Sequence, residues 1–160
     1  MNTADAKNEM IELLTKNEEL IAELYIAYSE KFPDYREFWI EIAEEEKKHS
    51  RWMRSLQAYT DDILSFNEGR IKPELMRISL TYVDKKIKEA KTEEMAIADA
   101  LTIALELETN MIERNYFKLF HGDSDELKSI FQNLESDTQQ HTNRVRNILA
   151  SLRKHGLSRG

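Results

Sequence analysis

The amino-acid sequence predicts an all-α protein built as a four-helix bundle, and three observations lead to this. The 160-residue chain contains only four glycines and two prolines, whereas the turns of a sheet protein need more of both. Charged residues make up 33% of the chain, which is typical of long helices with a solvated outer face. Apolar residues recur at alternating steps of three and four along four segments, the spacing of one helical face. A chain of this length should form a single domain, residues 1–160.

The first helix is predicted to run from a cap at Asn2 or Thr3 to about Lys31. Its apolar face contains one glutamate, Glu18. The helix should end before Pro33, because proline is poorly tolerated inside a helix and pushes the preceding residue out of the α region. So short a connection makes the second helix fold back antiparallel to the first. The other residues of this face are Ile11, Leu14, Ile21, Tyr25 and Tyr28.

The second helix, from about Tyr35 to Tyr59, carries two polar residues on its apolar face. Glu46 and His49 lie one helical turn apart there. An ionised carboxylate in a core is costly unless it is paired or binds a metal. The face therefore indicates a polar centre inside the bundle. Its apolar members are Trp39, Ile42, Met53 and Leu56.

Residues 60–91 are predicted to form a long crossover between the second and third long helices. It contains a short helix from Pro73 to about Ala90, because proline favours the first turn of a helix. A connection of this length lets the helices before and after it run parallel. The short helix has a loose apolar face of Leu75, Ile78, Tyr82 and Ile87.

The third long helix is predicted to begin with a cap at Thr92 and to end at a glycine C-cap, Gly122. Its apolar face again contains one glutamate, Glu108, whereas the nearby Glu106 lies off that face. The remaining face positions are Ile97, Leu101, Ala104, Met111 and Asn115.

The fourth long helix is predicted from about Asp125 to Arg153, after an N-cap at Asp123 or Ser124. One position on its apolar face is a histidine, His141. We expect the tail from His155 onwards to be frayed. The other face residues are Leu127, Phe131, Leu134, Thr138, Val145, Ile148 and Leu152.

The two halves of the sequence repeat the same arrangement of polar residues. Glu18 and Glu108 are 90 positions apart, and His49 and His141 are 92 positions apart. If the four faces meet in one bundle, these residues and Glu46 converge near its centre. Three carboxylates and two imidazoles suit iron or manganese, with zinc as an alternative. The five are therefore the candidate metal ligands, and we assign no catalytic residue beyond them.

A structural role is the alternative for each candidate. Glu46 and His49 would face solvent if the helix were rotated by one residue. Glu18 would pair with a lysine at the edge of the core. His141 would be a neutral core histidine that is hydrogen-bonded to a glutamate or a tyrosine.

The pattern of these residues resembles the rubrerythrin-like members of the ferritin-like superfamily over essentially the whole chain. The resemblance is carried by Glu18 with Tyr25, by Glu46-x-x-His49, by Glu108 with Tyr116, and by His141. It implies a ferritin-like four-helix bundle that holds two irons between helix pairs and reduces peroxide or dioxygen. The chain has no cysteines and so lacks the rubredoxin-type domain of that family. Its electrons should therefore come from a separate redox donor protein.

The sequence departs from the family three positions before His141, where Thr138 replaces an expected glutamate. Asp137 lies next to it, and the sequence leaves open whether its shorter side chain reaches the centre. Without that carboxylate, one bound metal is nearly as favoured as two. If Asp137 does not reach the centre, oxygen chemistry at two metals is disfavoured, and a metal-binding or non-catalytic bundle becomes the alternative. Iron storage in a hollow shell is a third and less favoured interpretation.

The composition of the chain excludes several classes of partner and of site. A net charge of −7 argues against nucleic acid, which needs a basic face. The absence of cysteine excludes disulfides, thiolate metal sites and iron–sulfur clusters. The sequence has no apolar run of membrane-spanning length and no signal peptide, so we expect a cytoplasmic protein without membrane contact. Apolar residues outside the four faces, such as Leu13 and Phe38, leave room for a homodimer contact.

Overall fold

The computed structural model describes residues 3–67, 72–110 and 119–159, with side chains described in 5–67, 72–110 and 119–155. These ranges contain five helices and a two-stranded antiparallel sheet, which confirms the all-α class. The helices are α1 (Thr3–Lys31), α2 (Arg36–Ser55), α3 (Pro73–Thr92), α4 (Ile97–Asn110) and α6 (Asp125–Arg159). Short 3₁₀ turns at Pro33–Tyr35 and Leu56–Ala58 flank α2. The strands are β1 (Ser65–Phe66) and β2 (Phe120–His121).

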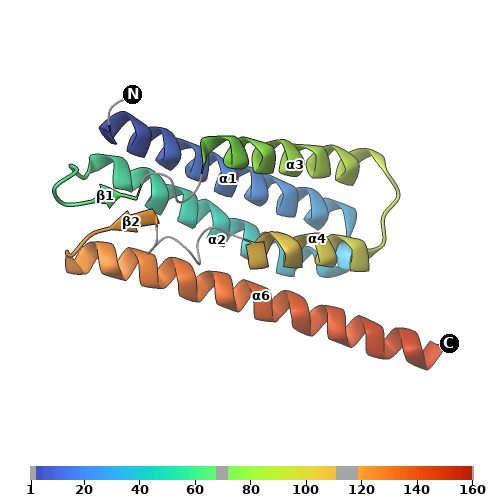
Figure 1. Ribbon diagram of the computed structural model, residues 1–160. Coiled ribbons are helices and arrows are strands. Elements are labelled where there is room, and N and C mark those ends of the chain that lie inside the picture. Colours follow the sequence, from blue (N-terminus) through green and yellow to red (C-terminus); the bar gives the residue numbers. More distant parts are fainter. Residues whose placement is uncertain (1–2, 68–71, 111–118, 160) are drawn as a thin grey trace.

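The helices lie side by side along a common long direction (Figure 1). α1 and α2 are antiparallel neighbours joined by the turn at Pro33, as predicted. α3 packs along α1 and carries the chain back to the end at which α2 began. As a result, α4 runs in the same direction as α2, and α6 then returns antiparallel to both. The segment between α2 and α4 therefore contains a helix, as predicted, but this helix is not short, because α3 has 20 residues, as many as α2.

Two predicted boundaries are wrong. The Thr92 hydroxyl donates to the Lys88 carbonyl at 2.8 Å, so Thr92 is the last residue of α3 and not the cap of the next helix. α4 begins at Ile97, where the Ala96 N–H donates to Asp99 Oδ2 at 3.1 Å. The tail is not frayed, because α6 continues to Arg159. The last part of the predicted third helix, with Met111, Asn115 and Tyr116, lies outside the described residues.

The apolar face predicted for the short helix is mostly wrong. Leu75, Ile78 and Tyr82 are exposed by 58%, 65% and 36%. Of the four predicted positions only Ile87 is buried. The packed face of α3 is rotated relative to the prediction and consists of Met76, Val83, Ile87 and Ala90.

The core consists of two apolar clusters, one toward each end of the bundle. On α1, Leu14 belongs to one cluster and Ile21 to the other. On α6, the same division falls between Leu134 and Val145. The part of the bundle between the two clusters is therefore occupied by other side chains.

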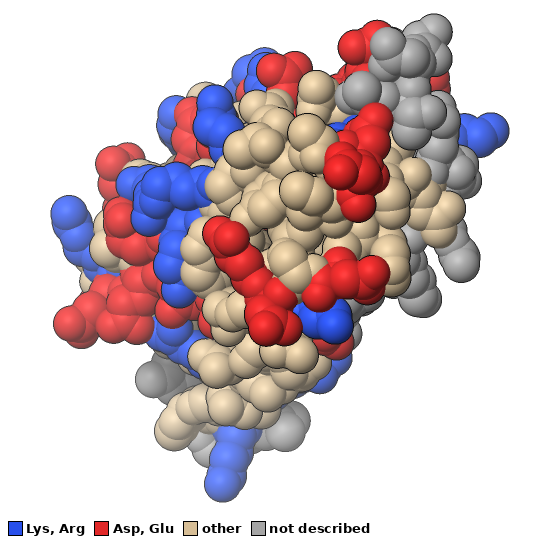
Figure 2. Space-filling model, turned by 90° about the vertical axis from the view of Figure 1, so that its left-hand side faces the viewer, with Lys and Arg blue, Asp and Glu red and all other residues tan. Residues whose placement is uncertain are grey.

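One end of the molecule is closed by the pairing of β1 with β2 and by a buried lysine. Figure 2 shows this end, where uncharged side chains form the middle of the face and acidic ones lie across it. Lys7 is 2% exposed and donates to the carbonyls of Tyr59 and Leu64 at 2.9 and 3.2 Å. It also pairs with Asp61 at 2.8 Å. Lys7 thus attaches the loop after α2 to α1.

In the turn between β2 and α6, the predicted cap at Gly122 is wrong and the predicted cap at Ser124 is confirmed. Gly122 follows β2 and is not the C-cap of a helix. A Cβ at Gly122 would lie 2.5 Å from Leu127 Cδ1 and 3.2 Å from the Ile63 oxygen, so a side chain there would have to displace Leu127. Ser124 caps α6, since its Oγ accepts from the Leu127 N–H at 3.2 Å. Among the described residues, no helix combines the length and apolar composition that a membrane span needs.

Candidate metal centre

Five buried side chains from four helices meet at the level between the two apolar clusters. We call them the Glu/His cluster, and none is more than 1% exposed. α1, α2, α4 and α6 all contribute, whereas α3 contributes nothing to it. The members are Glu18, Glu46, His49, Glu108 and His141.

The Glu/His cluster contains two groups of three side chains that could hold a metal ion. The first group is Glu18, Glu46 and His49, and the second is Glu46, Glu108 and His141. Within each group, one ligand atom of every residue lies within 4.8 Å of the other two. Glu46 belongs to both groups. The structure therefore brings together all five residues that the sequence singled out, and metal binding by them stays a prediction.

Both histidines direct the same ring nitrogen toward the glutamates. His141 Nδ1 lies 3.1 Å from Glu46 Oε1 and 3.5 Å from Glu108 Oε1. His49 Nδ1 lies 3.5 Å from Glu46 Oε2. Glu46 and His49 reach the centre together because they are three positions apart on α2, so they share one face.

The outer nitrogen of each imidazole contacts a second carboxylate. His49 Nε2 lies 3.0 Å from Asp137 Oδ2, and His141 Nε2 contacts a carboxylate oxygen of Glu45. Tyr25 donates a hydrogen bond to Glu108 Oε1 at 2.8 Å. A surrounding layer of this kind orients ligands and fixes which nitrogen faces a metal.

Thr138 and Asp137 both lie outside the two candidate groups. Thr138 is buried, and its hydroxyl donates to the Leu134 carbonyl at 2.9 Å. Asp137 Oδ2 contacts Lys48 Nζ at 3.3 Å and the outer nitrogen of His49 at 3.0 Å. Asp137 therefore does not take the place of the missing glutamate in either group.

Burial and neighbouring charges shift the pKa values of Glu46 and Glu108 in opposite directions. Burial would raise the pKa of Glu46, but the imidazoles of His141 and His49 outweigh it and hold the pKa at about 2. Burial raises the pKa of Glu108 to about 7, and the charge of Glu46 adds to this against the opposing effect of His141 and Tyr25. Glu46 thus stays ionised at neutral pH, whereas Glu108 keeps its proton to a higher pH than an exposed glutamate does.

The two imidazoles favour their protonated form. Burial would lower the pKa of His49, but Asp137 and Glu46 outweigh it and raise the pKa to about 9. Burial acts in the same direction on His141, but Glu108, Glu45 and Glu46 raise its pKa well above the ordinary value. Without a metal, protons therefore compensate part of the negative charge of the cluster.

The cluster passes a direct test of fit for a metal. Glu108 Oε2 is fully buried and accepts no hydrogen bond from any described residue, and the buried Glu46 Oε2 has only the long contact to His49 Nδ1 at 3.5 Å among the described residues. Buried carboxylate oxygens are almost always satisfied, because desolvating an ionised carboxylate is costly. One unsatisfied oxygen belongs to the shared residue and the other to the second group, which is the arrangement that bound cations would complete.

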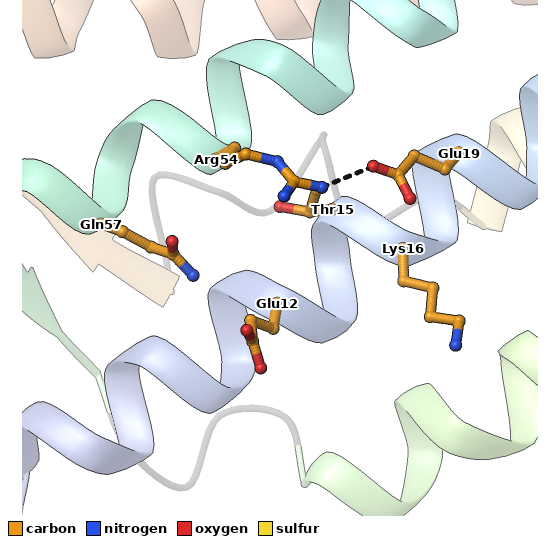
Figure 3. Close-up of a pocket in the computed structure, with 6 residues that line it drawn as sticks. All are labelled: Glu12, Thr15, Lys16, Glu19, Arg54 and Gln57. Carbon is orange, nitrogen blue, oxygen red and sulfur yellow. Dashed lines mark hydrogen bonds and ion pairs between the residues drawn. The ribbon is translucent and has the colours of Figure 1, made fainter.

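A surface pocket between α1 and α2 is separate from this centre. It has a volume of about 280 Å³ and is lined by Glu12, Thr15, Lys16, Glu19, Arg54 and Gln57. Arg54 donates to Glu19 across it at 2.6 Å (Figure 3). Glu19 follows Glu18 in the sequence but points outward, so the pocket contains no member of the Glu/His cluster.

Sequence reasoning missed Glu45. It lies off the apolar face of the second helix and is only partly buried. The one available signal was its position four residues before His49, which matches the spacing of Asp137 and His141. A scan against protein-family models, a search of curated proteins and a search of solved structures each find no match to this chain. The resemblance to rubrerythrin-like proteins therefore rests on the residues named above.

Proposed function

We propose that this chain binds two divalent metal ions, iron by preference, in the Glu/His cluster. They would serve to reduce peroxide or dioxygen with electrons from a separate donor protein. The chain would then be a rubrerythrin-like member of the ferritin-like superfamily without a rubredoxin-type domain. The observation that carries the proposal is the presence of two buried candidate groups that share Glu46.

The chemistry of the donor set supports iron. Three carboxylates and two imidazoles offer hard oxygen with some nitrogen, which suits iron and manganese and also accommodates zinc. Glu46 belongs to both groups, so it would be a ligand in both positions. Glu18 and His49 would complete one position, and Glu108 and His141 the other.

The residues of the chain exclude water and orient the ligands. Aromatic and aliphatic clusters close the centre on both sides along the bundle. Tyr25 fixes the orientation of Glu108 through its hydrogen bond. When bound, two ferrous ions would supply the two electrons that reduce peroxide to water. The fold itself does not determine this reaction, so that step rests on family analogy.

The position of Asp137 favours a second candidate function. Its carboxylate contacts the outer nitrogen of His49, so the cluster lacks the further carboxylate that the family pattern expects. Fewer carboxylates balance the charge of two divalent ions less well. The second candidate is therefore a metal-binding bundle that does not turn over peroxide or dioxygen.

The first experiment is metal content per chain by elemental mass spectrometry, on protein produced with iron and manganese supplied. Glu46→Ala and His141→Ala should lose metal. Glu44→Ala should keep it, because Glu44 is exposed and pairs with Lys47 on the surface. Peroxide consumption with a chemical reductant is the second measurement.

The outcomes separate the two candidates. Two irons per chain together with peroxide consumption would support the oxidoreductase. Two metals without consumption of peroxide or dioxygen would support the binding protein. Wild-type protein that is folded and binds no metal would overturn both.

A further inference from the structure

The C-terminal part of α6 differs in charge from the rest of the chain. Residues 138–160 contain five Lys or Arg and no Asp or Glu. The whole chain has 23 basic and 30 acidic residues, so residues 1–137 contain 18 basic and 30 acidic ones. Such a separation of charge along a chain is typical of an electrostatic contact with a partner. The basic residues of α6 that are described with their side chains in this part are Arg144, Arg146, Arg153 and Lys154.

The end of α6 projects beyond the helices on which α6 packs (Figure 1). Arg144 donates to Glu41 on the antiparallel α2 at 2.6 Å, and α2 begins five residues before Glu41, at Arg36. Because the two helices run in opposite directions, α6 passes the start of α2 at about residue 149. Residues 150–159 then continue the helix for about 15 Å.

We call residues 144–155 of α6 the basic segment, and most of its charges have no partner within the chain. Arg146, Arg153 and Lys154 are exposed, and none of them forms an ion pair with a described residue. The helix dipole favours basic side chains in the last turn of a helix. It therefore does not account for Arg146, which lies more than three turns before Arg159.

The surface of the basic segment is open to a partner. A hollow of about 530 Å³ is lined there by Ala150, Ser151, Lys154 and His155. Ala150 and Ser151 have short side chains and are exposed. A partner can therefore come close to the helix at these two residues while it meets the basic side chains on either side of them.

An acidic surface lies at the same end of the molecule, where α2 begins. A groove of about 580 Å³ is present there, and we call it the acidic groove. Asp34 and Glu37 in it are exposed and form no ion pair with a described residue. Three carboxylates against one guanidinium give the groove a charge opposite to that of the basic segment. Its lining residues are Pro33, Asp34, Arg36, Glu37, Ile40 and Glu41.

Other occupants fit the basic segment less well than a second copy of the chain does. An anionic membrane or a nucleic acid would also meet the acidic remainder of the molecule, and like charges that face each other are costly. The electron donor of the proposed function has to approach the Glu/His cluster. Lys154 lies 13 residues past His141, which is about 20 Å along the helix. A second copy offers an acidic groove of its own.

We propose that the basic segment of one molecule docks in the acidic groove of a second copy of this chain. Arg153 and Lys154 then face the second copy's Asp34 and Glu37. Both surfaces lie at the same end of each molecule, so a two-fold arrangement forms the contact twice and closes the assembly as a dimer. The two bundles are joined end to end, and the Glu/His cluster of each chain takes no part in the contact.

Sedimentation velocity on the full chain tests this contact. The wild type should be a dimer at low ionic strength and should dissociate as salt is added, because salt screens exposed charges. Arg153→Glu with Lys154→Glu should be monomeric, and so should Asp34→Lys with Glu37→Lys. An equal mixture of these two double variants should form a dimer again, because both contacts between them pair opposite charges.

Lys72→Glu with Lys128→Glu is the matched control for the α6 variant. Both lysines are exposed and lie near the starts of α3 and α6, away from the acidic groove. The control changes the net charge by the same amount and should remain a dimer. Arg153→Gln with Lys154→Gln removes the charges without reversing them and should weaken the dimer, so it replaces the charge reversal if that variant does not fold.

Cysteine crosslinking locates the contact. The chain has no cysteine, so Ser151→Cys and Ile40→Cys each introduce a single thiol. When the two variants are mixed, a short bismaleimide should join them into a heterodimer. Ser129→Cys is the control, because Ser129 is an exposed serine near the other end of α6. It should not be joined to Ile40→Cys.

The outcomes are decisive in both directions. A salt-sensitive dimer that is lost in each charge reversal and restored in their mixture would support the proposal. A wild type that is monomeric at every ionic strength would overturn it, and so would a dimer that survives either reversal. Monomers that bind phosphatidylserine vesicles or duplex DNA through Arg153 and Lys154 would assign the basic segment to that partner instead.

Discussion

The imidazole rings of His49 and His141 stack on each other, with ring centroids 5.7 Å apart and planes inclined by 23°. They come from antiparallel helices and belong to different candidate groups. Both direct Nδ1 toward Glu46, which is the residue the two groups share. The described residues thus offer two adjacent positions for a cation that depend on one carboxylate.

The shared position of Glu46 predicts unequal effects of the three cluster glutamates on metal content. Glu46→Gln should remove both metal ions, because it belongs to both groups. Glu18→Gln and Glu108→Gln should each remove one, because each belongs to a single group. The measurement is metal per chain after anaerobic loading with ferrous iron.

Glu23→Gln is the control for this series, since Glu23 is an exposed glutamate on the same helix as Glu18. It should bind as much iron as the wild type. Equal losses in all three cluster variants would contradict the division into two groups.

Metal affinity should increase with pH in the neutral range. Burial would lower the pKa of His49, but Asp137 and Glu46 raise it to about 9 in the metal-free protein. His49 is therefore protonated at pH 7, and a metal must displace that proton. Raising the pH removes the competing proton, so each displaced proton strengthens binding by about tenfold per pH unit up to the pKa. Manganese titrations between pH 6 and 8 would measure this slope.

The heat of binding in buffers of different ionisation enthalpy should show net proton release. A dissociation constant that does not change over this range would mean that the imidazoles do not bind the metal.

The two isoleucines of α3 should differ in their contribution to stability. Ile87 is 4% exposed and Ile78 is 65% exposed. Ile87→Ala should lower the free energy of unfolding by about 2–4 kcal/mol, since it removes buried methyl groups and leaves a cavity. Ile78→Ala should change it by less than about 0.5 kcal/mol, as is usual for an exposed site. Urea unfolding of both variants measures the difference. Equal effects would mean that Ile78 is buried, as the sequence predicted.

Lys7 should stabilise the loop after α2. Lys7→Met leaves the carbonyls of Tyr59 and Leu64 without their donor, at a cost of about 2 kcal/mol in the free energy of unfolding. The paired Asp61 is half exposed, so its charge can be solvated and adds little. Lys16→Met on the same helix is the control, because Lys16 is exposed. Hydrogen exchange of the loop amides should increase only in Lys7→Met.

The candidate ligands could be predicted from the sequence because each is a polar residue that interrupts an apolar helical face. A glutamate or histidine on an otherwise apolar face is rare enough to fix both its position and its direction. Glu18, Glu46 and His141 could each be read from one helix alone. The role of Glu45 could not, because it depends on the register between α2 and α6, which is set by tertiary packing.

The face of α3 shows a different limit of sequence reasoning. Its apolar residues fit two helical phases, one with Leu75 and Ile78 inward and one with Met76 and Val83 inward. Periodicity alone cannot choose between two such phases. The packing of α3 along α1 selects the second phase. A helix that is covered on one side only can keep large side chains on its other side in solvent.

The division of the core by the Glu/His cluster bears on how the protein would unfold. α1, α2 and α6 each pass through both apolar clusters and cross the polar level between them. A metal ion there would link helices that are far apart in the sequence, in the way a covalent cross-link does. In its absence the described residues at this level form hydrogen bonds and ion pairs between carboxylates and imidazoles. Cooperative unfolding of the two ends would then depend on the metal. Loss of the ion would coincide with the first partial unfolding of the molecule.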